Sequence, residues 1–363
     1  MRFGLIFEGN MPPDREETES RIFWQAIEQA VQAEKYGFEF QWAVEHHFLE
    51  GFSHCSAPEI FLASVAQHTE TMRIGHGVCL LPYKFNHPIR AAERAATLDI
   101  LSNGRLEFGT GRALTIAELE GFGIHPDDTR DMWDESMHII PRMWTEHEFQ
   151  GHKGKFLDIP KRVVVPKPVQ DPHPPVWLAC TSPTSYVRAG EYGLGALCLS
   201  FGKPADVGER LKTYHDARAS MTQPLVSQVN DQIAAFSVLH CAADDETARQ
   251  RGGKEAIGYL GQIAEYVGDV GMYDGYREWA EARGRDDKGQ RKDRGSEQDQ
   301  IDKMIQDAGL CLGDPDRCCE VIQGYADAGV DQFLGIVQYG NLEHDEIMEG
   351  IRLFGENVIP KFR

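Results

Sequence analysis

The sequence lacks any apolar run that approaches the ~20 residues needed to span a bilayer. The opening stretch MRFGLIFEGN is too short in its apolar part for a signal peptide, and no small-residue cleavage site follows it. Basic residues are scarce, since 37 Lys and Arg stand against 57 Asp and Glu and leave a formal net charge of -20. Such a charge opposes binding to nucleic acid or to anionic lipid surfaces. We therefore expect a cytoplasmic protein with no nucleic-acid or membrane partner.

Motifs for redox, metal and dinucleotide sites are missing too. The eight cysteines are scattered without a C-x-x-C pair, so we expect free thiols in a reducing compartment. No H-E-x-x-H or H-x-H pattern is present to supply zinc ligands, and we expect no metal site. No G-x-G-x-x-G follows the first expected strand, which weakens the case for a dinucleotide-binding open sheet.

What the chain does contain is a repeated alternation of short apolar segments with longer amphipathic ones. The expected strands are residues 2–9, 38–44, 73–81, 105–111, 175–180, 195–200, 233–241 and 332–338. The expected helices are residues 18–37, 57–70, 87–102, 128–148, 183–193, 205–221 and 343–357. Strands followed by helices predict a parallel sheet, and 363 residues suit its closure into an α/β fold of the (β/α)8 TIM-barrel type. An open doubly wound sheet is the structural alternative.

Two stretches interrupt this repeat. Residues 149–175, rich in Pro and Lys, predict an extended insertion before the fifth strand. Residues 244–314 predict a helical and polar insertion between the seventh and eighth strands. Within it, residues 282–300 carry mixed charge and almost no apolar side chains, so they cannot bury a core. We expect a single domain over residues 1–363, with 282–300 as a mobile surface loop or, alternatively, a gate over the active site.

The stretch WAVEHHF, Trp42–Phe48, ends the second expected strand with a glutamate and two histidines. The active site of a (β/α)8 barrel lies at the carboxyl ends of its strands, so these residues stand at its mouth. Because successive strand residues alternate faces, His46 points to one side while Glu45 and His47 point to the other. The two histidines therefore cannot easily bind one ion, and His46 is a candidate acid or base near neutral pH.

Four segments occur in a familiar order: YGFEFQWAVEHHF (36–48), RIGHGVCLLP (73–82), HPIRAAERAATLDILSNGRLEFGTGRA (87–113) and PPVWLACTSPTS (174–185). On these motifs the chain resembles the bacterial luciferase-like, flavin-dependent monooxygenase family, particularly the branch that contains the luciferase catalytic subunit. The resemblance implies a (β/α)8 barrel that uses FMN, as FMNH2, and O2. Through a flavin C4a-hydroperoxide it would oxygenate a small, apolar organic substrate. A homodimer and a separate NAD(P)H-flavin reductase are implied as partners.

The resemblance also implies roles for individual residues. His46 corresponds to the catalytic histidine of the family. Gly77 and Val78 correspond to the position of a non-prolyl cis peptide bond that bulges toward the flavin ring. Arg112 matches an arginine near the cofactor phosphate, and Glu118 matches an acidic residue near the flavin.

The chemistry of the phosphate-end residues agrees with these roles. Gly111 lets the backbone approach a ligand closely, and Arg112 can grip a phosphate through two parallel hydrogen bonds. Thr181, Ser182 and Thr184 lie where the fifth strand turns into a helix, and hydroxyls and free N–H groups at a helix N-terminus form a phosphate site. A plain salt bridge for Arg112 and simple N-capping at residues 181–184 are the structural alternatives.

Three aromatic residues near strand ends, Phe7, Trp42 and Phe201, could line an apolar substrate pocket, although such residues serve a core equally well. Two other functions stay open. An F420-dependent oxidoreductase on the same barrel would transfer hydride without oxygen, and the Glu-His-His-Phe motif disfavours it. A non-catalytic, flavin-binding accessory subunit is the second alternative, which the presence of both His46 and Arg112 disfavours.

Overall fold

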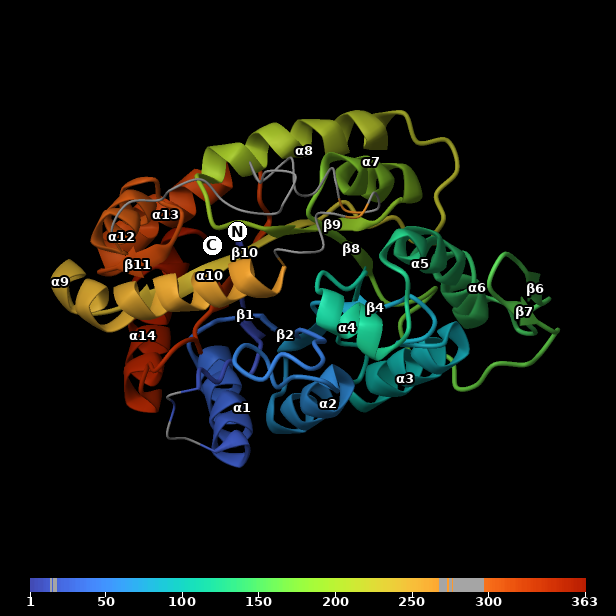
Figure 1. The fold of residues 1–363 in the computed structure, drawn as a ribbon, viewed down its shortest axis with the longest axis horizontal. Helices are drawn as coiled ribbons and strands as arrows, with labels where there is room; N and C mark the ends of the chain where they lie inside the picture. Colours follow the sequence, from blue (N-terminus) through green and yellow to red (C-terminus); the bar gives the residue numbers. More distant parts are fainter. Residues whose placement is uncertain (14, 16–17, 268–272, 274–275, 277–296) are drawn as a thin grey trace.

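The computed structural model describes every residue of the chain except 14, 16–17, 268–272, 274–275 and 277–296. Within the described residues, eight parallel strands close into a barrel that helices surround (Figure 1). In order around the barrel the strands are β1 (Arg2–Phe7), β2 (Phe40–Ala43), β3 (Arg73–His76), β5 (Leu106–Gly111), β8 (Val176–Cys180), β9 (Gly195–Leu199), β10 (Ile233–Cys241) and β12 (Gln332–Ile336). The pairs β1–β12 and β9–β10 complete the ring. The expected (β/α)8 barrel is confirmed.

The outer helices begin where local sequence signals place them. The first, α1 (Glu19–Lys35), begins after its N-cap Thr18, whose side chain accepts a hydrogen bond from the Arg21 amide. The other outer helices are α2 (Pro58–His68), α3 (Pro88–Leu101), α7 (Pro183–Tyr192), α8 (Pro204–Ala219), α13 (Pro315–Asp327) and α14 (His344–Asn357). Their caps and apolar stripes hold them against the strands.

The helix predicted over residues 128–148 is instead two helices, α5 (Thr129–Met137) and α6 (Ile140–Thr145). Pro141 explains the break, because proline has no N–H to donate within a helix but is tolerated in the first turn. A short helix, α4 (Ile116–Gly121), precedes them after β5. Helices α4 and α5 carry part of the site described below, whereas α6 lies toward the right edge of the molecule (Figure 1).

The insertion before the fifth barrel strand contains a small hairpin. Strands β6 (His152–Lys153) and β7 (Asp158–Ile159) pair antiparallel there. Figure 1 shows the hairpin at the right edge of the molecule, away from the barrel. The peptide bonds Val165–Pro166 and Asp171–Pro172 in the same insertion are cis.

Between β10 and β12 the chain forms a second insertion. Its elements are α9 (Asp245–Ala248), a π-helical turn (Arg249–Gly253), α10 (Lys254–Tyr266), α12 (Glu297–Gln306) and β11 (Cys311–Gly313), which pairs with the end of β10. Of the loop predicted at 282–300, residues 282–296 lie outside the described residues. Its last four residues are not a loop, since α12 begins at Glu297.

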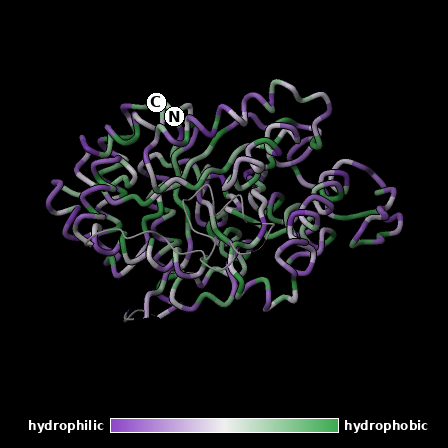
Figure 2. Tube along the Cα trace, turned by 45° about the horizontal axis from the view of Figure 1, so that its top comes forward, coloured by the Kyte–Doolittle hydropathy of each residue, from purple (hydrophilic) through white to green (hydrophobic). Residues whose placement is uncertain are grey.

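Alternation along β1 separates an outer from an inner layer. The ring of Phe7 faces the helices, stacking on Phe61 at 4.3 Å between centroids and meeting Phe23 at 5.2 Å. Ile6, on the opposite face, points into the barrel beside Gly77. Figure 2 shows that hydrophobic residues gather toward the middle of the molecule, while hydrophilic residues are most frequent on its outer turns.

Several features follow from the described ranges as a whole. None of their helices combines the length and the apolar character required to cross a membrane. No group of three or more His, Cys, Asp or Glu side chains in these ranges is arranged to hold a metal ion. All eight cysteines are free thiols, as the sequence predicts.

Candidate active site

A cavity opens at the carboxyl ends of the barrel strands, with α10 as one wall. Its empty space, which includes solvent at the open mouth, is about 860 Å³. Apolar side chains dominate its lining, among them Val44, Phe52, Leu80, Leu199, Phe236 and Tyr259. We call this cavity the apolar chamber. Few polar side chains line the chamber, so each of them is a candidate for ligand binding or catalysis.

His46 lies in the wall of the apolar chamber, just beyond the end of β2, with about a fifth of its side chain exposed (22%). Its Nδ1 lies 3.0 Å from Oε1 of Glu118, a side chain that is fully buried. Burial lowers the pKa of His46, but the charge and hydrogen bond of Glu118 outweigh it and raise the pKa above its ordinary 6.5. Because Nδ1 is engaged, Nε2 is the ring nitrogen left for a ligand in the chamber.

His47 does not line the chamber, whereas Glu45 lines it together with His46; because β2 ends at Ala43, strand alternation does not extend to these residues as predicted. His47 Nε2 lies 3.3 Å from Oε1 of Glu45, which also accepts Asn86 Nδ2 at 2.8 Å. The other oxygen of Glu45 accepts the backbone amide of Leu80 at 2.8 Å. Glu45 therefore ties the end of β2 to the segment after β3, and His47 belongs to this structural network.

The backbone after β3 approaches the chamber closely. The Gly77–Val78 peptide bond is cis, as the resemblance implied, and both residues line the chamber. Two glycines of β5 leave room for this segment. A Cβ at Gly109 would lie 1.9 Å from the carbonyl oxygen of His76, and one at Gly111 would lie 2.6 Å from the Val78 side chain. A larger residue at position 109 or 111 would therefore push the segment after β3 out of place.

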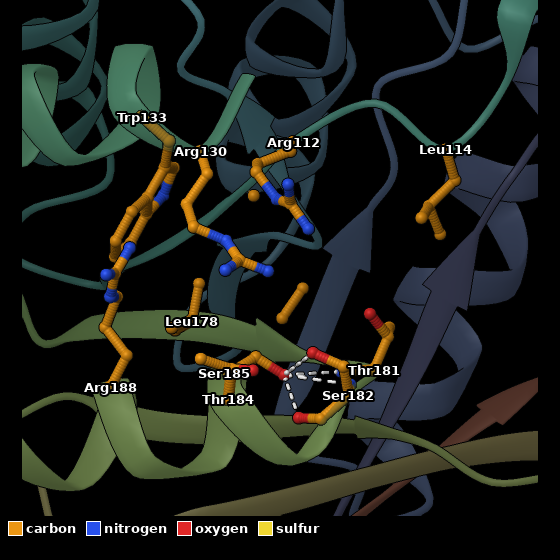
Figure 3. Close-up of a pocket in the computed structure, with 12 residues that line it drawn as sticks. Arg112, Leu114, Arg130, Trp133, Leu178, Thr181, Ser182, Thr184, Ser185 and Arg188 are labelled. Atoms are coloured by element: carbon orange, nitrogen blue, oxygen red, sulfur yellow. Dashed lines mark hydrogen bonds between the residues drawn. The ribbon is translucent and has the colours of Figure 1, made fainter. Parts of the chain in front are cut away.

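Next to the chamber lies a second cavity lined by cationic and hydroxyl groups, which we call the arginine subsite (Figure 3). The described part of the chain places three arginines around it, Arg112 after β5, Arg130 on α5 and Arg188 on α7. Figure 3 shows Arg112 and Arg130 extending toward the N-terminus of α7. That N-terminus contributes Thr181, Ser182, Thr184 and Ser185.

The groups of the arginine subsite are fixed by their own contacts. Arg112 donates to Thr129 Oγ1 at 3.1 Å, and its guanidinium lies 4.6 Å from the ring centroid of Tyr276. At the start of α7, the hydroxyl of Ser185 accepts the amides of Thr181 and Ser182, each at 3.0 Å. Concentrated positive charge beside a helix N-terminus favours a bound phosphate.

The two cavities are adjacent. Four residues, Arg112, Leu114, Ala179 and Thr181, line both of them. A ligand with an anionic end and a flat apolar body can therefore occupy the arginine subsite and the chamber together. The structure thus brings the predicted cofactor-binding residues into one site, in which Glu118 acts through His46.

The three aromatic residues considered for the substrate pocket do not line the chamber. Phe7 packs outward against α1 and α2. Trp42 fills the barrel interior, where it lies on Gly75 and meets Trp177 edge-on at 5.5 Å. Phe201 is half-buried behind the chamber wall, with its ring 6.3 Å from that of Tyr259. The structure therefore assigns Phe7 and Trp42 to the core.

Some residues of the site escaped prediction from sequence. Glu8 lines the chamber, and its signal was available, because the alternation that turns Phe7 outward turns the next residue inward. Arg188 was also within reach, since it lies four residues after Thr184 on the same helix face. Arg130 reaches the subsite only through the packing of α5, and no local pattern indicates that.

Comparison with known proteins gives a consistent picture. Residues 1–332 match the model of the family described as luciferase-like monooxygenase. The 4-hydroxyprotoasukamycin monooxygenase of Streptomyces nodosus subsp. asukaensis is 34% identical over 194 residues, 51% of this chain and 49% of that protein. The oxygenase component of the flavin-dependent trigonelline monooxygenase of Acinetobacter baylyi is 32% identical over 195 residues, 53% of this chain and 52% of that protein. The chain spans about half the length of these curated relatives.

Solved structures share the fold over the whole chain. Monooxygenase RslO1 from Streptomyces bottropensis has a TM-score of 0.83 at 24% identity, over 100% of both chains. The oxygenating constituent of 3,6-diketocamphane monooxygenase of Pseudomonas putida, in complex with FMN, has a TM-score of 0.78 at 22% identity, over 100% of this chain and 99% of that one. An F420-dependent secondary alcohol dehydrogenase reaches 0.73 at 19%, over 100% and 99%. These neighbours show the fold alone, and the family model matches 332 of the 363 residues. The chain belongs to the luciferase-like monooxygenase family.

Proposed function

We propose that this chain is the oxygenase component of a two-component monooxygenase. It would take reduced FMN from a separate NAD(P)H-flavin reductase and transfer one oxygen atom of O2 to a small, mostly apolar organic substrate. The overall reaction balances as substrate, O2 and FMNH2 giving oxygenated substrate, water and FMN. One observation carries the proposal: a histidine held by a buried carboxylate lines an apolar chamber that shares four lining residues with the adjacent arginine subsite.

The arginine subsite fits the phosphate of FMN. Arg112 and Arg130 supply guanidinium groups on one side, while Thr181, Ser182 and Thr184 supply hydroxyls and backbone amides at the N-terminus of α7 on the other. Arg130 has no hydrogen-bond or ion-pair partner within the described residues, although it lines a cavity. A guanidinium that lines a cavity without a protein partner is available to bind an anionic ligand.

The chamber end of the site fits the flavin ring. Gly77 and Val78 would support one face of the ring, and Gly111 lets the chain approach the ring closely. Bound reduced FMN would supply the two electrons that activate O2. Apolar walls would exclude bulk water and so protect reactive species from unproductive hydrolysis.

His46 would manage the proton. Glu118 fixes the imidazole through Nδ1, and its charge keeps the ring protonated to higher pH than usual. Nε2 would therefore hold a proton toward the chamber and donate it to the oxygen atom that leaves as water. His47, engaged with Glu45, supports the loop and takes no part in proton transfer.

The expected homodimer is part of the proposal. Helices α2 and α3 lie side by side on the barrel (Figure 1), and each exposes a large apolar side chain on the outside. Ile60 on α2 is 67% exposed and Leu101 on α3 is 52% exposed. Burial of such residues against a second copy would remove apolar surface from water.

The test of the proposed function uses purified chain, FMNH2 and ¹⁸O2. Decanal, limonene and cyclohexanone serve as trial substrates, and mass spectrometry detects incorporation of one labelled oxygen atom into product. Product with one label that requires both the chain and FMNH2 is expected. His46→Ala should lower product formation by about 10²–10⁴-fold while FMN still binds, because a positioned acid or base contributes that much.

The rival functions give different outcomes. If the chain binds the deazaflavin cofactor F420 more tightly than FMN and reduces a carbonyl compound without oxygen uptake, it is a hydride-transfer enzyme. If it binds FMN but His46→Ala leaves product formation unchanged, His46 has no catalytic role. If FMN binds and no trial substrate is ever labelled, an accessory subunit explains the result better than an oxygenase.

A further inference from the structure

Glu8 is a buried carboxyl group with an open oxygen. It follows β1, is 4% exposed and lines the apolar chamber. The hydroxyl of Tyr259 on α10 donates to its Oε2 at 2.6 Å. Within the described residues no donor reaches Oε1. Oε1 therefore keeps its capacity to accept a hydrogen bond from a ligand in the chamber.

The other two carboxyl groups near the chamber are fully engaged. Glu45 accepts from Asn86 and from the Leu80 amide, so both of its oxygens have donors. Glu118 accepts from His46 on one oxygen and from Thr115 on the other. Among the described acidic residues at this site, only Glu8 has an acceptor to spare.

The surroundings of Glu8 connect it to His46. The ring of Phe52 lies 5.6 Å from that of His46 and 5.6 Å from that of Tyr259. Phe52 therefore spans the wall between the histidine and the Glu8–Tyr259 pair. A molecule that hydrogen-bonds to Glu8 would lie along the Phe52 ring, with its far end near His46.

We propose that Glu8 determines substrate specificity by binding a hydrogen-bond donor, a hydroxyl or amine N–H, on an otherwise apolar substrate. This inference rests on the proposed function in one respect: it takes the molecule that binds Glu8 to be the substrate that is oxygenated. A carboxylate at the same place carries no hydrogen to donate to Oε1, so carboxylate substrates should bind more weakly. Tyr259 orients the carboxyl group and leaves Oε1 free for the ligand.

Equilibrium dialysis of the purified chain against three compounds of nearly equal shape tests this proposal. The compounds are p-cresol, p-xylene and p-toluate, which carry a hydroxyl, a methyl group and a carboxylate at the same place. Wild-type protein should bind p-cresol about tenfold more tightly than p-xylene, the usual effect of a hydrogen bond to a carboxyl group. It should bind p-toluate more weakly than p-cresol. Glu8→Leu should lose the preference for p-cresol.

Two further variants test whether the preference for p-cresol depends on Glu8 itself. Tyr259→Phe removes the internal donor but keeps Glu8, so the preference for p-cresol should persist or increase. Glu209→Leu, the same change at an exposed site on α8, should behave as wild type. If Glu8→Leu fails to fold by circular dichroism, Glu8→Gln keeps the side-chain volume and should still reduce the preference several-fold.

The proposal is overturned if Glu8→Leu binds the three compounds as wild type does, if Tyr259→Phe abolishes the preference, or if p-toluate binds best. These measurements need neither flavin nor oxygen. A chain that fails the labelling test yet shows the Glu8-dependent preference would refute the oxygenase function and leave the ligand preference intact. The reverse combination would refute only the role of Glu8.

Discussion

His46 Nδ1 and Glu118 Oε1 lie 3.0 Å apart at the mouth of the barrel, and the same carboxylate oxygen accepts the His47 amide at 3.1 Å. One side chain thus fixes both the imidazole and the backbone that carries it. Glu118 is itself held by Thr115, the N-cap of α4, whose hydroxyl donates to Oε2 at 2.7 Å. Thr115 therefore fixes the orientation of the Glu118 carboxylate, and this carboxylate fixes the orientation of the His46 ring.

Glu118→Gln is expected to move the alkaline limb of the pH–activity profile to lower pH. Burial lowers and the Glu118 charge raises the pKa of His46, and the charge prevails. Glutamine keeps a hydrogen-bonding oxygen but not the charge, so the proton of His46 is lost at a lower pH. The measurement is kcat/KM for product formation from about pH 5.5 to about pH 9.

Glu120→Gln is the matched control, because Glu120 is an exposed residue of the same helix. Its pH profile should overlay that of the wild type. A Glu118→Gln profile with an unmoved alkaline limb would mean that His46 is not the titrating acid.

Arg130→Ala is expected to weaken FMN binding about tenfold and to leave riboflavin binding unchanged. The two flavins differ only in the phosphate, and the Arg130 guanidinium reaches into the arginine subsite. Fluorescence titration with both flavins makes the comparison. Arg90→Ala, at an α3 arginine whose side chain is 66% exposed, should leave both affinities unchanged. An equal loss for riboflavin would exclude a role specific to the phosphate.

The barrel could be predicted because its signals are local. Apolar strands, amphipathic helices and caps such as Thr18 each depend on a few neighbouring residues. The continuous helix predicted over 128–148 overlooked one such signal, Pro141. Arg112 and Thr181 came together as predicted because β5 and β8 are neighbours, and parallel strands present their carboxyl ends at one edge.

The rest of the site depends on packing that no short pattern encodes. Phe7 and Glu8 are neighbours in the sequence, but only Glu8 lines the chamber. The prediction chose Phe7 because an apolar side chain suits an apolar pocket, and it was wrong. Tyr259 meets Glu8 across 251 residues, because α10 folds back over the barrel. Such a contact is set by the tertiary arrangement of the insertion and not by its sequence pattern.

Gly109→Ala is expected to destabilise the protein by about 3 kcal/mol. The added Cβ would lie 1.9 Å from the His76 carbonyl oxygen, and the backbone of β3 cannot yield without losing its place next to β5. Urea unfolding monitored by circular dichroism gives the free energy. Gly258→Ala is the control, since this exposed α10 glycine has open space around it and alanine should stabilise the helix by about 0.5–1 kcal/mol. Equal stabilities of the two variants would contradict the close approach of the strands.

The His46–Glu118 pair should also stabilise the fold within a limited pH window. The pKa of His46 is raised in the folded state, so its contribution is full below 6.5 and is lost as pH rises through the raised value. The pKa of Glu118 is lowered by the nearby His46 against the effect of burial, so its contribution is full above 4.5 and is lost as pH falls through the lowered value. Both conditions hold between pH 4.5 and 6.5.

Glu118→Gln should therefore cost about 2 kcal/mol of unfolding free energy near pH 5.5 and clearly less at an alkaline pH above the raised pKa of His46, where the imidazole has lost its proton in both proteins. Urea unfolding of wild type and variant at the two pH values measures the difference. His46→Gln should show the same pH dependence, because it removes the other half of the pair. A Glu118→Gln penalty of equal size at both pH values would mean that a neutral hydrogen bond, and not the ion pair, holds the imidazole in the chamber wall.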